Sequence, residues 1–106
     1  MNIQVALRLG RVSNLPTVWT NVLAGLTLAG AGASAAQIAA LMISMTFFYL
    51  GGMYLNDAFD AKIDAAERPD RPIPSGQVSA RTVFCLGFAM LALGIIGLAC
   101  AGTRLP

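Results

Sequence analysis

Three long stretches without a charged side chain dominate this sequence of 106 residues. They cover about residues 15–33, 35–55 and 82–102, and none of them contains Asp, Glu, Lys or Arg. A helix needs about 20 consecutive, mostly apolar residues to cross the hydrocarbon core of a bilayer, and each stretch is about that long. The sequence therefore predicts an all-α integral membrane bundle, a single membrane domain with three transmembrane helices.

The composition excludes most soluble classes of protein. Charged residues make up 11% of the chain, against about 25% in a typical soluble domain. Apolar residues make up 57%, which is more than a small soluble fold could cover, because such a fold leaves much of its surface wet. We therefore expect membrane lipids around the helices. The small net charge of +2 and the lack of a basic run with interleaved aromatic residues exclude nucleic acid as a partner.

The three stretches are rich in glycine and alanine, which would weaken isolated soluble helices. In a bilayer, small residues instead let helices approach one another closely. The glycines are therefore typical of packed membrane helices; they are Gly25, Gly30, Gly51, Gly52, Gly87, Gly94 and Gly97.

The first stretch has a second interpretation, as a cleaved signal sequence. Arg8 and Arg11 precede the apolar run, and Ala33-Ser34-Ala35 resembles a signal-peptidase site. The run is long for a signal core, however, and its first half contains polar residues such as Thr20 and Asn21. These features favour a retained transmembrane helix.

The basic residues of the loops predict how the chain is oriented in the membrane. Arg8 and Arg11 precede the first stretch, and the turn near Ser34 has no basic residue. The positive-inside rule therefore places the N-terminus and the 62–81 segment in the cytoplasm. We expect the cell inner membrane as the location. The basic residues of the 62–81 segment are Lys62, Arg68, Arg71 and Arg81.

All five acidic residues of the chain fall between residues 57 and 70. Asp57, Asp60 and Asp64 follow the second apolar stretch at steps of three and four, so a helix that continues to about residue 66 places them on one face. Asn56 lies one turn before Asp60. Like charges at this spacing destabilise a helix, and anions are disfavoured near its C-terminus. The pattern therefore indicates a compensating ligand.

Magnesium is the ligand that this pattern favours. Mg²⁺ takes oxygen ligands and is commonly held by one or two carboxylates together with substrate phosphates. Zinc is a poor candidate because the chain has no histidine and no cysteine near the aspartates. We therefore predict Asp57, Asp60 and Asp64 as metal ligands and catalytic residues. The alternative interpretation is a solvated helix end that is merely acidic.

The loop at about residues 67–79 supplies the opposite charge. Pro69 and Pro72 end the helix, and Arg68 and Arg71 follow closely after the aspartates. Arginine suits phosphate because its planar guanidinium can bind two oxygens, although both arginines also fit the simpler role of orientation signals. Carboxylates with Mg²⁺, arginines and an apolar helical wall suit a ligand with a diphosphate head and a hydrocarbon tail, such as an isoprenyl diphosphate.

Three segments resemble one known family, the UbiA superfamily of intramembrane prenyltransferases. Residues 56–64, Asn-Asp-Ala-Phe-Asp-Ala-Lys-Ile-Asp, match its N-D-x-x-D-x-x-x-D motif. Residues 71–76, Arg-Pro-Ile-Pro-Ser-Gly, resemble the R-P-x-x-S-G run that follows this motif in many members. Residues 8–17 resemble the segment that leads into the family's first helix.

The resemblance implies a bundle of about nine transmembrane helices around a cavity in which two Asp-rich motifs hold Mg²⁺ and a prenyl diphosphate. The implied reaction transfers the prenyl group to a hydrophobic acceptor, often an aromatic ring, while Mg²⁺ neutralises charge on the departing diphosphate. Residue by residue, the resemblance implies Asp57, Asp60 and Asp64 as catalytic metal ligands and Asn56, Arg68, Arg71 and Asn14 as diphosphate-binding residues.

The sequence departs from the family pattern in one large respect. No acidic residue follows Asp70, so a second Asp-rich motif is absent, and only three apolar stretches are present. Three helices cannot enclose a cavity. We therefore expect this chain to be the N-terminal part of such an enzyme, a fragment or truncated frame, and to be inactive alone.

Two other membrane classes compete with this interpretation. A CDP-alcohol phosphatidyltransferase would carry a D-G-x-x-A-R motif, which the chain lacks. A non-catalytic three-helix membrane protein, whose acidic stripe binds a cation or a partner, stays open as the alternative. Soluble prenyl synthases of the DDxxD type are excluded by the hydropathy of the chain.

Overall fold

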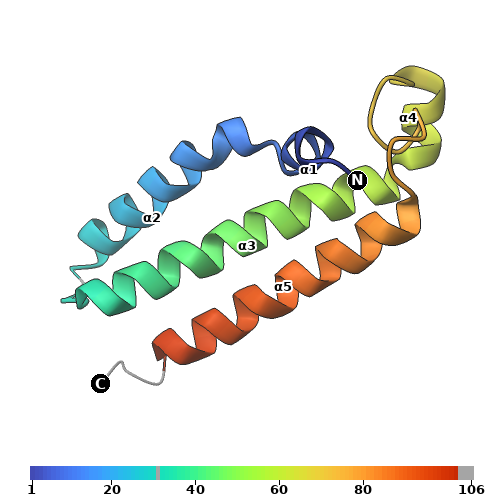
Figure 1. Ribbon diagram of the computed structural model, residues 1–106. Helices are drawn as coiled ribbons and strands as arrows, with labels where there is room; N and C mark the ends of the chain where they lie inside the picture. The colour runs from blue at the N-terminus through green and yellow to red at the C-terminus, as the bar shows by residue number, and fades with distance from the viewer. Residues whose placement is uncertain (31, 103–106) are drawn as a thin grey trace.

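The structure, a computed structural model, describes residues 1–30 and 32–102, and every regular element within those ranges is helical. The long helices α3 and α5 pack side by side and run in opposite directions, and α2 lies along another side of α3 (Figure 1). This confirms the predicted all-α bundle. The elements are α1 (Ile3–Gly10), the 3-10 helix η1 (Val12–Asn14), α2 (Leu15–Ala29), α3 (Ala35–Phe59), α4 (Ala61–Glu67) and α5 (Ala80–Gly102).

Two helices in the described ranges are long and apolar enough to cross a membrane. They are α3, with 25 residues, and the Ala80–Ala101 part of α5, with 22 residues. The helix α2 has 15 residues, which is about 22 Å at 1.5 Å per residue, less than the core thickness of about 30 Å. The predicted count of three spanning helices is therefore not confirmed.

The first predicted span, about residues 15–33, is longer than the helix that forms there. The helix α2 begins at Leu15, with Pro16 in its first turn, where a missing N–H costs no helical hydrogen bond. Gly30 adopts a left-handed conformation with φ 65°, and its N–H donates to the carbonyls of Leu26 and Thr27. Such a glycine cap ends a helix because it satisfies the last free carbonyls.

A capping box starts α3. The hydroxyl of Ser34 accepts a hydrogen bond from the backbone N–H of Gln37 at 3.2 Å, and the Gln37 side chain accepts one from the Ser34 N–H at 2.9 Å. These two bonds satisfy backbone donors that a helix start leaves free. The cap therefore sets where the long helix begins.

We expect Ser34→Ala to lower the free energy of unfolding by about 1 kcal/mol, because alanine cannot accept the bond from Gln37. Ser34→Asp is the matched control, since aspartate caps about as well as serine. Unfolding of the purified chain in SDS, followed by circular dichroism, measures both variants. Equal stability of the two variants would contradict the cap's assigned role.

The predicted helix through residue 66 is interrupted at Asp60. The helix α3 ends at Phe59, Asp60 has φ −88° and ψ 4°, and α4 begins at Ala61. The amide of Asp60 still donates to the Asn56 carbonyl at 3.0 Å, and the amide of Asp64 donates to Asp60 at 2.8 Å. The chain therefore bends rather than unwinds, at a residue of low helix propensity among like charges.

Glycines bring α3 and α5 into close contact. A Cβ atom on Gly51 would lie 2.9 Å from the carbonyl oxygen of Gly87, and one on Gly87 would lie 2.7 Å from Cγ of Leu55. Such a short approach leaves no room for a methyl group. The small residues predicted to pack membrane helices therefore do so at this crossing.

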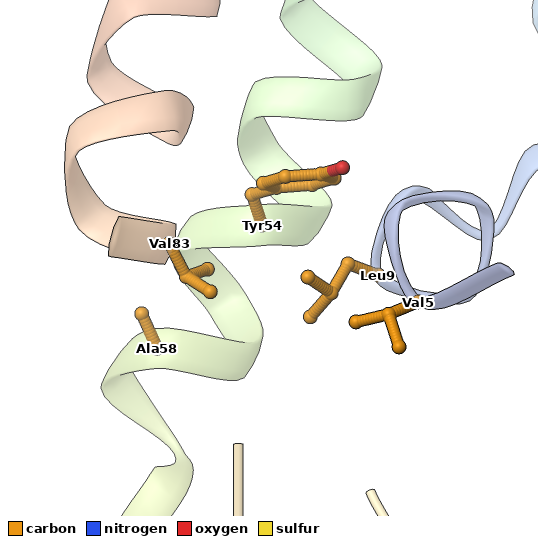
Figure 2. Close-up of a cluster of buried hydrophobic side chains, with 5 residues drawn as sticks. All are labelled: Val5, Leu9, Tyr54, Ala58 and Val83. Carbon is orange, nitrogen blue, oxygen red and sulfur yellow. The ribbon is translucent and has the colours of Figure 1, made fainter. Parts of the chain in front are cut away.

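The short helix α1 docks on the C-terminal end of α3. Its apolar side chains Val5 and Leu9 join a buried cluster with Tyr54 and Ala58 of α3 and Val83 of α5 (Figure 2). The Tyr54 hydroxyl also donates to the Ala6 carbonyl at 2.9 Å. These contacts hold α1 at the end of α3 from which the acidic segment continues (Figure 1).

Candidate functional site

Charged side chains from four segments converge where α3 ends. Asp57 comes from α3 and Asp64 from α4, and both residues are buried, with 5% and 0% of their surface exposed. Arg11 comes from the turn after α1, and Arg71 from the loop after α4. Buried carboxylates need ionic or hydrogen-bonding partners, and the arginines provide them.

Asp57 contacts two arginines through the same oxygen. Its Oδ1 lies 3.1 Å from Nη2 of Arg11, which donates a hydrogen bond, and 3.6 Å from Nη1 of Arg71. The first of these contacts joins residues 46 positions apart in the chain. It therefore ties the N-terminal segment to the acidic motif.

Asp64 also contacts two arginines. Its Oδ1 accepts a hydrogen bond from Arg68 at 3.3 Å, and its Oδ2 accepts one from Arg71 at 3.1 Å. Arg71 thus bridges Asp64 and Asp57. The two carboxylates consequently face one shared region rather than separate patches of surface.

The loop after α4 is folded tightly enough to position Arg71. The amide of Ser75 donates to the Arg71 carbonyl at 3.0 Å, and the amide of Gln77 donates to the Pro72 carbonyl at 3.0 Å. Pro72 is buried. Arg8 of α1 donates to the Asp70 carbonyl at 3.3 Å, so α1 also braces this loop.

A comparison with models of known protein families matches residues 17–105, most of the chain, to the UbiA prenyltransferase family. The chain belongs to this family. The predicted resemblance is thereby confirmed.

Three curated relatives of this UbiA family member are named digeranylgeranylglyceryl phosphate synthase. The protein from Ignicoccus hospitalis is 42% identical over 98 residues, which cover 92% of this chain and 32% of the relative. The Methanopyrus kandleri protein is 39% identical over 93 residues, which cover 84% of this chain and 32% of the relative. The Methanothrix thermoacetophila protein is 34% identical over 91 residues, which cover 85% of this chain and 34% of the relative. The chain therefore spans about a third of the length of these relatives, and no solved structure matches it.

The structure of this UbiA family member brings together four of the seven site residues predicted from sequence. The other three make no side-chain hydrogen bond or ion pair with them in the described part of the chain. Of these three, Asn14 and Asn56 are exposed and Asp60 is partly buried. The four that meet are Asp57, Asp64, Arg68 and Arg71.

Sequence reasoning missed Arg11 as a site residue. In the sequence, the charge of Arg11 indicates membrane orientation or a signal sequence, whereas its pairing with Asp57 depends on how α1 folds back onto α3. The sequence feature that could have identified Arg11 is its position within residues 8–17, the segment that resembles the family's lead-in to the first helix.

The carboxylate oxygens of this cluster suit a magnesium ion that is bound together with phosphate. No group of three or more His, Cys, Asp or Glu side chains within the described residues is placed to hold a metal ion, so the three predicted aspartates do not form a cage. Asp57 and Asp64 nevertheless offer oxygen atoms toward one region. Mg²⁺ is commonly held by one or two carboxylates with phosphate oxygens as further ligands, and this arrangement suits that mode.

An apolar groove lies between α2 and α3. Its volume is about 470 Å³, and Tyr49 is part of its wall. The hydroxyl of the same Tyr49 donates to the Arg11 carbonyl at 3.2 Å. The groove therefore borders the segment that carries Arg11. Its lining residues are Val18, Asn21, Val22, Met45, Phe48 and Tyr49.

Proposed function

We propose that this chain forms the diphosphate-binding part of a Mg²⁺-dependent prenyltransferase that uses an isoprenyl diphosphate as the donor. The observation that carries the proposal is Arg71 bridging two buried aspartates of the N-D-x-x-D-x-x-x-D motif. Membership of the UbiA prenyltransferase family supports this class of reaction. In this proposal, the further catalytic parts come from segments equivalent to the two thirds of the relatives that this chain does not match.

In this proposal, the carboxylates bind the metal ion and the arginines bind the diphosphate headgroup of the donor. Asp57 and Asp64 hold Mg²⁺ together with phosphate oxygens, and Asp60 joins them when the ligand binds. The bound ion neutralises charge that develops on the leaving diphosphate. Arg68 and Arg71 bind diphosphate oxygens, because a guanidinium can donate two parallel hydrogen bonds. Asn56 and Asn14 donate further hydrogen bonds to the diphosphate, because both side chains are exposed and make no side-chain hydrogen bond within the described residues.

The hydrocarbon tail of the donor lies in the groove between α2 and α3. The groove is mostly apolar, and its Tyr49 adjoins the Arg11 segment, so a ligand with its head at the arginines has its tail directed along the groove. The apolar wall excludes water from the reacting carbon. Exclusion of water matters because water would compete with the acceptor for the prenyl group.

The acceptor we propose is a glyceryl phosphate lipid that already carries one prenyl chain. The relatives are named for a product with two geranylgeranyl groups on glyceryl phosphate. This favours a lipid alcohol over the aromatic acceptor that the wider family suggests. The donor is then geranylgeranyl diphosphate.

The protein is integral to a membrane in this proposal, and the cell inner membrane is the location we infer. The helices α3 and α5 provide the apolar spans. The N-terminus and the 62–81 segment lie together at one end of the bundle (Figure 1), and their basic residues favour the cytoplasm for that end.

A chimera tests the proposed function. We expect the Ignicoccus hospitalis relative to keep Mg²⁺-dependent geranylgeranyl transfer when this chain replaces the segment it matches. The 106-residue chain alone binds the donor without turnover, because it carries one aspartate-rich motif. Formation of radiolabelled digeranylgeranylglyceryl phosphate measures the transfer.

Two variants control the chimera. Asp64→Asn in this chain removes transfer, whereas Glu67→Gln, an exposed acid in the same helix, keeps it. A correctly inserted chimera that transfers nothing, in either form, would instead favour a non-catalytic membrane protein with an acidic stripe.

A further inference from the structure

Arg11 has an unusual backbone conformation. Its φ of 48° and ψ of 53° lie in the left-handed region, and it is the non-glycine residue with positive φ among those the structure describes. A side chain with a Cβ atom adopts this region at a cost of roughly 1 kcal/mol or more. The turn after α1 therefore keeps an arginine where a glycine would be easier to accommodate.

Contacts on both sides hold Arg11 in this conformation. Its carbonyl accepts a hydrogen bond from the Tyr49 hydroxyl at 3.2 Å. The preceding Gly10 lies so close to α3 that a Cβ atom there would be 2.7 Å from Cδ2 of Leu50. The backbone is thus fixed against α3, and the guanidinium is aimed at Asp57 at 3.1 Å.

The side chains of Arg11 and Asp57 differ in their exposure to solvent. The Asp57 side chain is 7% exposed, and that of Arg11 is 36% exposed. The carboxylate therefore stays in place, whereas the guanidinium has open space on its outer side. An arginine on a carboxylate competes with any metal ion for the same oxygen atoms, because both are cations seeking one anion.

We propose that Arg11 is a positioning residue that exchanges partners: it holds Asp57 in the free protein and moves to a diphosphate oxygen when Mg²⁺ and diphosphate bind. The inference rests on the proposed function, because it takes Asp57 as a ligand of the metal–diphosphate group. It explains why a buried carboxylate of the motif has an arginine from outside the motif as its nearest partner. The exchange keeps Asp57 neutralised until the metal arrives.

The test is calorimetric titration of the full 106-residue chain in detergent micelles, first with MgCl₂ alone and then with inorganic pyrophosphate in excess Mg²⁺. Arg11→Asn removes the charge with a residue that tolerates positive φ. We expect it to strengthen binding of Mg²⁺ alone by about fivefold and to weaken binding of pyrophosphate by about tenfold. The two effects have opposite signs, which mere loss of structure does not produce.

Arg81→Gln is the matched control for charge. Arg81 is exposed in the first turn of α5 and makes no side-chain hydrogen bond or ion pair within the described residues, so both affinities should stay within about twofold of the wild type. Arg11→Asn behaving like this control, or weakening both affinities, would overturn the partner exchange while leaving the proposed function standing. Wild-type chain that binds no pyrophosphate in Mg²⁺ overturns the proposed function and the exchange together.

A second variant decides the matter if Arg11→Asn does not fold, as judged by its helical circular dichroism. Tyr49→Phe removes only the hydroxyl that holds the Arg11 carbonyl. We expect shifts of the same two signs, each about twofold, because one neutral hydrogen bond is lost. Unchanged affinities in Tyr49→Phe would then count against the proposal.

Discussion

Asp64→Asn is expected to weaken Mg²⁺-dependent binding of pyrophosphate by more than about tenfold and to lower the free energy of unfolding by about 2 kcal/mol. The side chain of Asp64 is 1% exposed and accepts hydrogen bonds from Arg68 and Arg71. Asparagine keeps the shape but removes the charge, so two arginines lose their shared counter-charge. The stability loss is smaller than for a fully buried pair, since Arg68 is 52% exposed and Arg71 28% exposed.

Glu67→Gln makes the same change of charge in the same helix and is the control for Asp64→Asn. The Glu67 side chain is 65% exposed and lies 3.8 Å from Arg68. An ion pair this exposed contributes little to folding, so Glu67→Gln should change the free energy of unfolding by less than about 0.5 kcal/mol. Unfolding in SDS and titration with pyrophosphate measure both variants. Equal losses in the two would show that the buried aspartate has no special role.

Gly51→Ala is expected to destabilise the α3–α5 pair by about 1–3 kcal/mol. The added methyl group would lie 2.9 Å from the Gly87 carbonyl oxygen and 3.1 Å from Cδ2 of Leu91. Backbone cannot move aside as the end of a flexible side chain can, so the two helices must separate. Separation weakens the packing of Leu55 against Gly87 one turn further along α3.

The neighbouring glycine provides a matched control for this prediction. A Cβ atom on Gly52 meets no atom within 4 Å, so Gly52→Ala should be neutral or slightly stabilising, because alanine has the higher helix propensity. Unfolding in SDS, followed by circular dichroism, compares the two variants. A loss of stability as large in Gly52→Ala as in Gly51→Ala would contradict the close crossing.

Local patterns in the sequence predicted most of the helices. The uncharged stretches located α3 and α5, because apolar length alone decides which helices can span a bilayer. The same criterion overestimated the length of α2, because the left-handed cap at Gly30, rather than hydropathy, sets where this helix ends. The bend at Asp60 was also missed, since even spacing of aspartates does not reveal where like charges break a helix.

Sequence spacing predicted the site only where its partners are close in the chain. Asp64 and Arg68 are four residues apart and Arg71 follows within seven, so their meeting could be expected from the motif. The Arg11–Asp57 pair joins residues 46 apart. That pair forms only because Val5, Leu9 and Tyr54 fold α1 back onto α3 (Figure 2), which is a tertiary contact that no spacing encodes.

Equilibrium binding of radiolabelled geranylgeranyl diphosphate to the 106-residue chain in lipid nanodiscs tests the central claim most directly. Saturable binding in Mg²⁺ that disappears in EDTA, and that the Asp57→Asn, Asp64→Asn double variant lacks even in Mg²⁺, is the result we predict. Binding of equal strength in EDTA, or in the double variant, would contradict the claim that these buried aspartates hold the donor's headgroup through magnesium.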